Sequence, residues 1–250
     1  MRPLYNINGL VHWSEREIKA RERVVTFFAD EVAAFLRGQN RAWEIERVEA
    51  PMMLPMALVN PNYAPEDLWT FVRHDENEPV LVARPETTPS TYAWMTHRLA
   101  SHDGVRLPYC CWQVGKSFRV EQDKVLSHMR LKEFYQQEFQ CAYSADTAND
   151  YQEKSLEPVR RMIATATGLP TRIVPSDRLP DYSLRTMDIE VDTGDRWMEV
   201  CSISKRKDFP VKNRFQNKKK EWIETDVLVL EIAIGVDRVV FAAGIAESRL

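Results

Sequence analysis

Arginines and carboxylates are spaced along one stretch of the chain in a way that could bind a nucleotide. Arg119 and Glu121 are two positions apart, so on a strand their side chains lie on the same face. A second strand running back beside the first would add Arg130, Phe134 and Glu138 to that surface. Guanidinium groups bind phosphate oxygens, a ring can cover a purine, and carboxylates accept hydrogen bonds from ammonium or amino groups. The stretch therefore suits a nucleoside triphosphate and a small amine.

This stretch is one of several motifs that follow each other along the chain. Gly115 to Glu121, followed by Arg130-Leu131-Lys132-Glu133-Phe134, resembles the second signature motif of class II aminoacyl-tRNA synthetases. Gly235-Val236-Asp237-Arg238 resembles the third motif, and Pro51 after a long amphipathic segment resembles the first. Three further segments resemble the glycyl-tRNA synthetases most closely: Arg84-Pro85-Glu86-Thr87, Tyr182 to Glu190 and Glu199 to Phe209. One motif alone is weak evidence, but the ordered set is specific.

The periodicity of apolar residues predicts the elements that would position these motifs. A capping box at Ser14 to Glu17 opens a helix that we expect to end at Gly38, before a strand over 43–50. Residues 52–79 carry no clear pattern and are expected to be irregular. Further predicted elements are a strand ending at 83, a helix over 87–99, antiparallel strands over 108–121 and 130–143, a helix over 148–168, strands over 186–191, 196–204 and 227–234, and a helix over 235–243.

Antiparallel strands with flanking helices predict the α+β class, here the antiparallel sheet flanked by helices of class II aminoacyl-tRNA synthetases. We expect a single catalytic core domain over residues 1–250, a length that can form one large domain. The first motif would occupy about 15–55, the second about 115–140 and the third about 228–243. The chain ends soon after the third motif, so the anticodon-binding domain that glycyl-tRNA synthetases of this type carry there is expected to be lacking.

Bulk composition is that of a globular protein, with 44% hydrophobic and 28% charged residues. The net charge of -3 gives no general attraction to nucleic acid or membrane, so a polyanion contact would need a local patch. Lys218-Lys219-Lys220 is one such run, interpreted here as a solvated face, with a phosphate contact as the alternative. No segment resembles a membrane span or a signal peptide, which favours the cytoplasm and no membrane partner. The four cysteines form no CxxC pair and are expected to be reduced core residues rather than zinc ligands.

The resemblance implies ATP-binding and catalytic roles for residues of the second and third motifs. Arg119 would bind the α-phosphate as charge builds in the transition state, and Arg238 would bind the γ-phosphate of a bent ATP. Phe134 would stack on adenine, and Glu121 would accept a hydrogen bond from its amino group. Arg130 would orient a phosphate or neighbouring carboxylates. Arg119 and Arg238 are thus the expected catalytic residues.

The resemblance also implies a magnesium ligand and an amino-acid pocket. Glu231 matches an acid expected to hold Mg²⁺ that bridges the phosphates of ATP. Arg206 would take the substrate carboxylate, and Glu86 and Glu138 would surround its amino group. Ala233 would lie at the pocket, where the glycyl family usually has a serine.

Three departures from the glycyl pattern bear on the choice of amino acid. Ala233 lacks the serine hydroxyl, which frees space, so alanine or serine could enter a pocket that discriminates by about 1–3 kcal/mol per methylene. Thr88-Pro89 replaces Ala-Gln, and Pro89 has no N–H to donate. Ser202 replaces a glycine and narrows the approach. Glycine nevertheless remains the favoured substrate.

Together these features predict ATP-dependent activation of a small amino acid as an aminoacyl-adenylate. The acceptor would be tRNA, or a carrier protein, a small molecule or a modified nucleic-acid base. The first motif implies a homodimer, although its pattern alone fits a plain core helix. Two other functions stay open: a non-catalytic paralogue, similar to the accessory subunit of a mitochondrial DNA polymerase, and an amino-acid sensor without turnover. The presence of Arg119, Phe134, Arg206 and Arg238 weighs against the paralogue.

Overall fold

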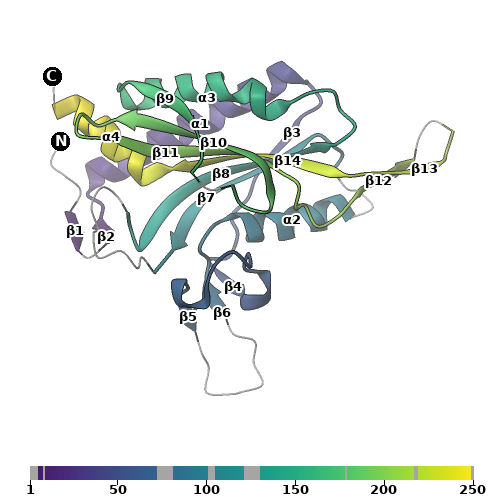
Figure 1. Ribbon diagram of the computed structural model, residues 1–250, viewed down its shortest axis with the longest axis horizontal. Coiled ribbons are helices and arrows are strands. Elements are labelled where there is room, and N and C mark those ends of the chain that lie inside the picture. The colour runs from purple at the N-terminus through teal and green to yellow at the C-terminus, as the bar shows by residue number, and fades with distance from the viewer. Residues whose placement is uncertain are drawn as a thin grey trace.

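The computed structural model describes residues 5–7, 9–71, 81–100, 105–120, 130–177, 179–216 and 219–248. A seven-stranded sheet forms its centre, in the order β3-β7-β8-β14-β11-β10-β9 (Figure 1). All neighbouring pairs are antiparallel except β3 and β7. Its strands are β3 (Glu44–Arg47), β7 (Tyr109–Phe118), β8 (Glu133–Ser144), β9 (Thr171–Pro175), β10 (Ser183–Asp192), β11 (Trp197–Arg206) and β14 (Val227–Gly235). The predicted α+β fold with a flanked antiparallel sheet is confirmed.

One face of the sheet is apolar because alternate residues of its strands are hydrophobic. Three helices cover this face: α1 (Glu15–Gln39), α3 (Tyr151–Thr167) and α4 (Val236–Ser248) (Figure 1). Phe28 of α1 and Ile163 of α3 are fully buried in one cluster with Phe139, Ile203 and Ile232 from the strands. This packing fixes the sheet as a rigid support for whatever the opposite face carries.

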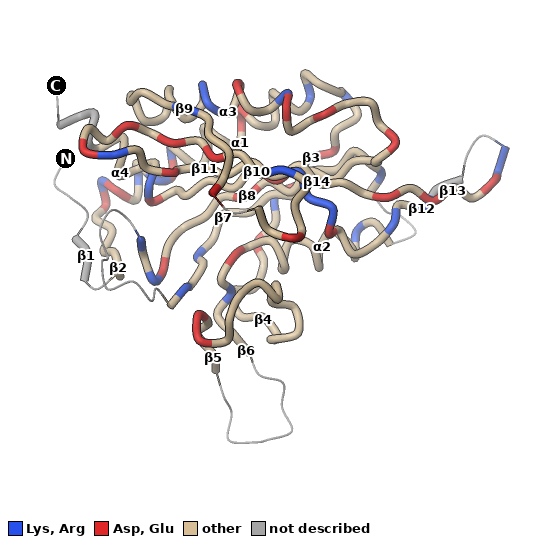
Figure 2. Tube along the Cα trace, in the orientation of Figure 1, with Lys and Arg blue, Asp and Glu red and all other residues tan. Residues whose placement is uncertain are grey.

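The opposite face is largely polar and is covered at one end by α2 (Thr88–Ala100) (Figure 1). Tyr92 and Met95 of α2 pack on Tyr109, Ala142 and Val229 in a second apolar cluster. Beyond α2 the strands present glutamate, glutamine and serine side chains, many of them buried. Charged residues of both signs are spread along the rest of the described trace (Figure 2).

Residues 52–71, together with the predicted strand that ends at 83, form a small unit beside the main sheet, and the elements within 52–71 correct the expectation of irregular structure there. It contains β4 (Met53–Pro55), β5 (Thr70–Phe71), β6 (Leu81–Ala83) and the 3-10 helices η1 (Met56–Leu58) and η2 (Pro65–Asp67). The strands are paired in the order β4-β6-β5. β4 and β5, of three and two residues, are too short to show an alternating pattern, which is why the sequence gives no signal for them. Two hairpins complete the fold: β1 (Tyr5–Ile7) with β2 (Leu10–His12), and β12 (Asn213–Gln216) with β13 (Trp222–Thr225).

Several local expectations are met, and one is not. The capping box is present, with the Ser14 N–H donating to Glu17 at 2.7 Å. Gly168 caps α3 in the left-handed conformation, with φ 67°. Gly38 does not end α1, which continues to Gln39 and is capped by Asn40 in extended conformation.

Two features can be compared with the composition: the state of the cysteines and the apolar length of the helices. All four cysteines are free and buried, as predicted for core residues. Cys110 and Cys141 are cross-strand partners of β7 and β8, with their sulfur atoms 3.1 Å apart. Within the described residues, no helix combines the length and apolar character needed to cross a membrane.

Candidate active site

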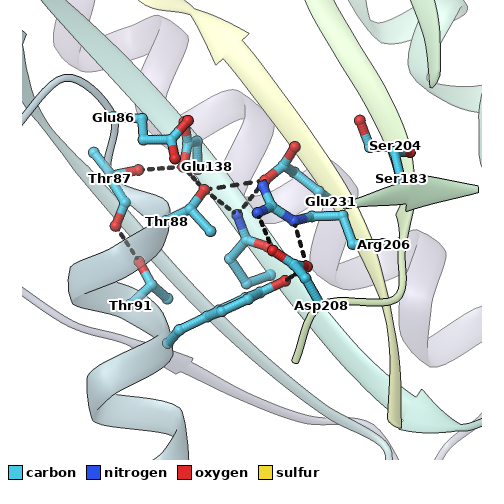
Figure 3. Close-up of polar contacts among 12 residues, drawn as sticks. Glu86, Thr87, Thr88, Thr91, Glu138, Ser183, Ser204, Arg206, Asp208 and Glu231 are labelled. Carbon is cyan, nitrogen blue, oxygen red and sulfur yellow. Dashed lines mark hydrogen bonds and ion pairs between the residues drawn. The ribbon is translucent and has the colours of Figure 1, made fainter. Parts of the chain in front are cut away.

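Four carboxylates gather on the polar face of the sheet, where α2 begins (Figure 3). Glu138 on β8 and Glu231 on β14 come from neighbouring strands, and Glu86 precedes α2. The strand register places Ala233 opposite Glu138, and Glu231 opposite Gln140. The three glutamates are 7% exposed or less. Such burial of acids is costly unless cations or hydrogen-bond donors compensate for it, so the cluster is a candidate ligand site.

Arg206, at the end of β11, is the cation within this cluster. Its Nη1 lies 2.6 Å from Oε2 of Glu231, and its Nε and Nη2 lie 3.0 and 2.7 Å from the two carboxylate oxygens of Asp208. The ring of Tyr182 lies against the guanidinium, 3.9 Å from its centre. Burial disfavours the charged form, but Glu231 and Asp208 outweigh it and raise the pKa of Arg206. Three of its five N–H groups are engaged, which leaves two for another partner.

Hydroxyl groups at the start of α2 and an amide group of β8 arrange the carboxylates. Thr87 donates to Oε2 of Glu138, and the hydroxyl of Thr88 lies 3.0 Å from both Glu138 and Glu231. Gln140 donates to Glu231 at 2.8 Å. A hydroxyl has one proton, so Thr88 can donate to only one of its two carboxylates at a time. The two acids are therefore close and incompletely compensated.

Two of the glutamates, Glu86 and Glu138, hold their protons more tightly than ordinary carboxyl groups because they are buried. Burial, followed by the charges of Glu231 and Glu86, raises the pKa of Glu138 to about 7. Burial also raises the pKa of Glu86, and Arg206 opposes this shift. Oε1 of Glu86 is buried and has no hydrogen-bond partner among the described residues. An orphaned buried acceptor beside other acids is suited to a cationic donor such as an ammonium group.

Arg119, just beyond β7, lies next to this cluster. Its Nε donates to the Pro85 carbonyl at 3.0 Å, and its Nη2 donates to the Tyr63 hydroxyl at 3.0 Å. Its guanidinium lies 5.2 Å from the centre of the Phe134 ring. The hydroxyl of Tyr63 in turn lies 3.2 Å from Oε2 of Glu86. The structure thus brings the predicted nucleotide residues Arg119 and Phe134 beside the predicted amino-acid residue Glu86.

Arg84 holds the segment before α2 against the sheet. It is 1% exposed, and its Nε donates to the Lys116 carbonyl at 2.8 Å, while its Nη1 donates to Gln113 at 2.9 Å. A side chain at Gly115 would overlap the Arg84 guanidinium, so only glycine leaves room for it. Arg84 therefore fixes the position of Glu86, two residues further along the chain.

Asp237 and Arg238 of the third motif contact residues of β8 and β11. Asp237, at the start of α4, accepts a hydrogen bond from the Tyr135 N–H. Burial raises the pKa of Asp237 to about 7, against the effect of that hydrogen bond. Arg238 donates to the Glu199 carbonyl at 2.9 Å. Arg130 is exposed.

Two further observations concern Glu121 and possible metal ligands. Glu121 lies outside the described residues. Among the described residues, no group of three or more His, Cys, Asp or Glu side chains is arranged to hold a metal ion.

Sequence reasoning missed several members of the site. Asp208 had a signal, since it lies within the segment Glu199 to Phe209 and only two residues after Arg206. Thr88 and Gln140 were weaker candidates, because a neutral polar residue at a strand or helix end is common. Tyr63 had no signal, since it lies in a segment without periodicity, far along the chain from its partners.

Comparison with known proteins identifies the family. Residues 69–246 match the family model described as tRNA synthetase class II core domain (G, H, P, S and T). The chain belongs to this family. Its curated relatives include the glycine–tRNA ligase of Mycoplasmopsis synoviae, 27% identical over 180 residues, and that of Mycoplasma capricolum, 29% identical over 184. Each match covers 67% of this chain and 40% of the relative, so the chain spans about two fifths of their length.

A solved structure shows the class II fold directly. The prolyl-tRNA synthetase of Cryptosporidium parvum, complexed with halofuginone and AMPPNP, aligns with a TM-score of 0.71 at 15% identity. The alignment covers 97% of this chain and 48% of that one. At such low identity the likeness supports the fold of this class II core domain, and its site must be argued from its own residues.

Proposed function

We propose that this class II core domain activates a small amino acid, with glycine favoured, by forming an aminoacyl-adenylate from ATP. The observation that carries the proposal is the buried cluster of Glu86, Glu138 and Glu231 around Arg206, next to Arg119. The cluster suits an ammonium group, and Arg119 suits a phosphate. These groups belong to the two substrates of one reaction, in which the amino acid is bound through its ammonium group while its carboxylate reacts with the α-phosphate of ATP.

The amino-acid end of the proposed site comprises Glu86, Glu138, Arg206 and Ala233. The unpartnered Oε1 of Glu86 is a ready acceptor for the ammonium group, and Glu138 can accept alongside it. The two remaining N–H groups of Arg206 would serve the substrate carboxylate. Ala233 lies opposite Glu138 in the register and adds only a methyl group, which favours glycine without a strong barrier to alanine or serine.

The ATP end comprises Arg119, Phe134, Arg238, Arg130 and Glu121. Arg119 and Phe134 lie together, as the cation for the α-phosphate and the ring for the adenine should. Arg238, at the start of α4, donates to the Glu199 carbonyl, and its role at the γ-phosphate of a bent nucleotide remains a proposal from the motif. Arg130 as an orienting cation and Glu121 as acceptor for the adenine amino group remain proposals from the motif.

The reaction joins a carboxylate oxygen of the amino acid to the α-phosphorus and releases pyrophosphate. Both reactants are anionic at the reacting ends, so Arg119 would bring them together and stabilise the charge that develops. Glu231 supplies a carboxylate, the ligand type that Mg²⁺ uses together with nucleotide phosphates, and we propose it as the Mg²⁺ contact. When bound, the ion would neutralise phosphate charge.

The acceptor and the assembly are also proposals. The relatives are named glycine–tRNA ligases, which supports tRNA as the acceptor. A carrier, a small molecule or a modified nucleic-acid base remains the alternative. A homodimer is supported by the position of β3 at the edge of the sheet, beside a cavity of about 440 Å³ lined by residues 46–51 and α2. The cytoplasmic location stays a prediction.

Amino-acid-dependent exchange of pyrophosphate into ATP tests the activity directly. Exchange should be highest with glycine when all twenty amino acids are compared, and lower with alanine and serine. Arg119→Ala should abolish exchange, while Arg161→Ala, on the outer surface of α3, should retain it. Absence of exchange with every small amino acid would refute the proposal. Charging of total tRNA then separates a tRNA ligase from an enzyme that serves another acceptor.

A further inference from the structure

A tyrosine outside every sequence motif connects the two ends of the proposed site. Tyr63 lies between η1 and η2, in the small unit beside the main sheet. Its hydroxyl is 3.0 Å from Nη2 of Arg119 and 3.2 Å from Oε2 of Glu86. Arg119 belongs to the nucleotide end and Glu86 to the amine end. One hydroxyl therefore contacts a residue of each half.

The direction of both hydrogen bonds is fixed by chemistry. A guanidinium group can only donate, so the phenol oxygen accepts from Arg119. The single proton of Tyr63 then goes to Glu86 when Glu86 is ionised. Oε2 of Glu86 is occupied in this way, and Oε1 is the oxygen left buried and unpartnered among the described residues. Tyr63 thus determines which oxygen of Glu86 is available to a ligand.

The same contacts constrain Arg119. Its Nε is held by the carbonyl of Pro85, the residue directly before Glu86, and its guanidinium lies 5.6 Å from the centre of the Tyr63 ring. Arg119, Tyr63 and the Pro85-Glu86 segment therefore form a closed ring of contacts. The positive charge of Arg119 polarises the phenol and strengthens the hydrogen bond that the phenol donates to Glu86. Ordering one end of the site must accordingly order the other.

We propose that Tyr63 is a positioning residue that couples nucleotide binding to amino-acid binding, an inference that rests on the proposed activation reaction. A phosphate that binds Arg119 also fixes the phenol of Tyr63. The phenol in turn keeps Oε2 of Glu86 occupied, so that Oε1 faces the ammonium group. A bound ammonium group orders Glu86 and so Arg119. Because the ordering is shared, each substrate raises the affinity of the site for the other.

The test compares Tyr63→Phe with Tyr92→Phe as a matched control. The hydroxyl of Tyr92 lies in the same cluster, 3.2 Å from Asp208, and has no described contact with Arg119. Glycine affinity is measured by calorimetry with and without a non-hydrolysable ATP analogue. In the wild type and in Tyr92→Phe, the analogue should tighten glycine binding about fivefold or more. In Tyr63→Phe the ratio should fall to about one, although the ring and the fold are retained.

The outcomes separate this inference from the proposed function. A wild-type ratio of one, or a Tyr63→Phe ratio equal to that of the wild type, overturns the role of Tyr63. A wild type that supports no amino-acid-dependent exchange overturns the activation reaction itself. Exchange kinetics give a second readout, since a merely structural role would lower kcat alone. Loss of coupling instead makes the KM for glycine independent of ATP concentration.

Discussion

Replacing Glu138 by glutamine should stabilise the folded protein at neutral and alkaline pH. The pKa of Glu138 rises from 4.5 to about 7 on folding. Below pH 4.5 both the folded and the unfolded chain carry the proton, so this group contributes no difference. Between pH 4.5 and 7 the unfolded chain ionises while the folded chain keeps the proton, and the free energy of unfolding falls. The full loss is about 3 kcal/mol above pH 7.

Glutamine has the same shape and no charge to bury. Its carbonyl oxygen can still accept from Thr87 and Thr88, as Oε2 of Glu138 does. The difference in unfolding free energy, Glu138→Gln minus wild type, should therefore grow from near zero at pH 4.5 to about 3 kcal/mol at pH 8. Groups that titrate alike in both proteins cancel from the difference.

Urea unfolding of both proteins at several pH values, followed by circular dichroism, measures this difference. The variant should at the same time lose most amino-acid-dependent exchange, because a neutral amide binds an ammonium group less well than a carboxylate. Two parallel pH profiles, with a difference that stays constant within about 0.5 kcal/mol, would refute the reasoning. They would mean that Glu138 is ionised in the folded protein without penalty.

Three further perturbations test other parts of the site. Arg206→Met leaves Glu231 and Asp208 without their cation, so the free energy of unfolding measured with urea at pH 8 should fall by about 3–5 kcal/mol. The decrease should be smaller at pH 5, where carboxylates take up protons. Gly115→Ala forces Arg84 out of its position, so the free energy of unfolding should fall by about 1–3 kcal/mol. Pyrophosphate exchange by this variant should also be weaker. Because an ammonium ligand favours ionised Glu138, the KM for glycine in pyrophosphate exchange should rise as pH falls below about 7, and Glu138→Gln should not show this rise.

The fold could be predicted well because its main elements obey simple periodicities. The capping box at Ser14 and the left-handed cap at Gly168 were visible as residue types at fixed offsets. The long strands β7, β8 and β14 carry enough residues for their patterns to stand out. By contrast, β4 and β5 have three and two residues, and their pairing depends on β6 rather than on their own sequence.

The site could be predicted only where a motif carried it. Motif residues such as Glu86 and Glu138 do converge, but the sequence did not indicate how Arg206 is shared between Asp208 and Glu231. That arrangement depends on the register of β11 and β14, which places distant residues side by side. Tyr63 is the clearest case, since its partners lie 23 and 56 positions away and no local pattern connects them.

The excess of acid in the cluster is understandable only with a positively charged ligand. Glu86, Glu138, Glu231 and Asp208 outnumber the cations around them, which are Arg206 with Arg84 and Arg119 nearby, and burial raises the pKa of Glu138 to about 7. A cluster of this kind lowers the stability of the folded chain, since replacing an acid by its amide would remove the penalty. An ammonium group relieves the same penalty by supplying a charge and hydrogen-bond donors together. The energy that destabilises the empty site therefore becomes affinity for the amine, and the contact through Tyr63 makes that affinity depend on the nucleotide.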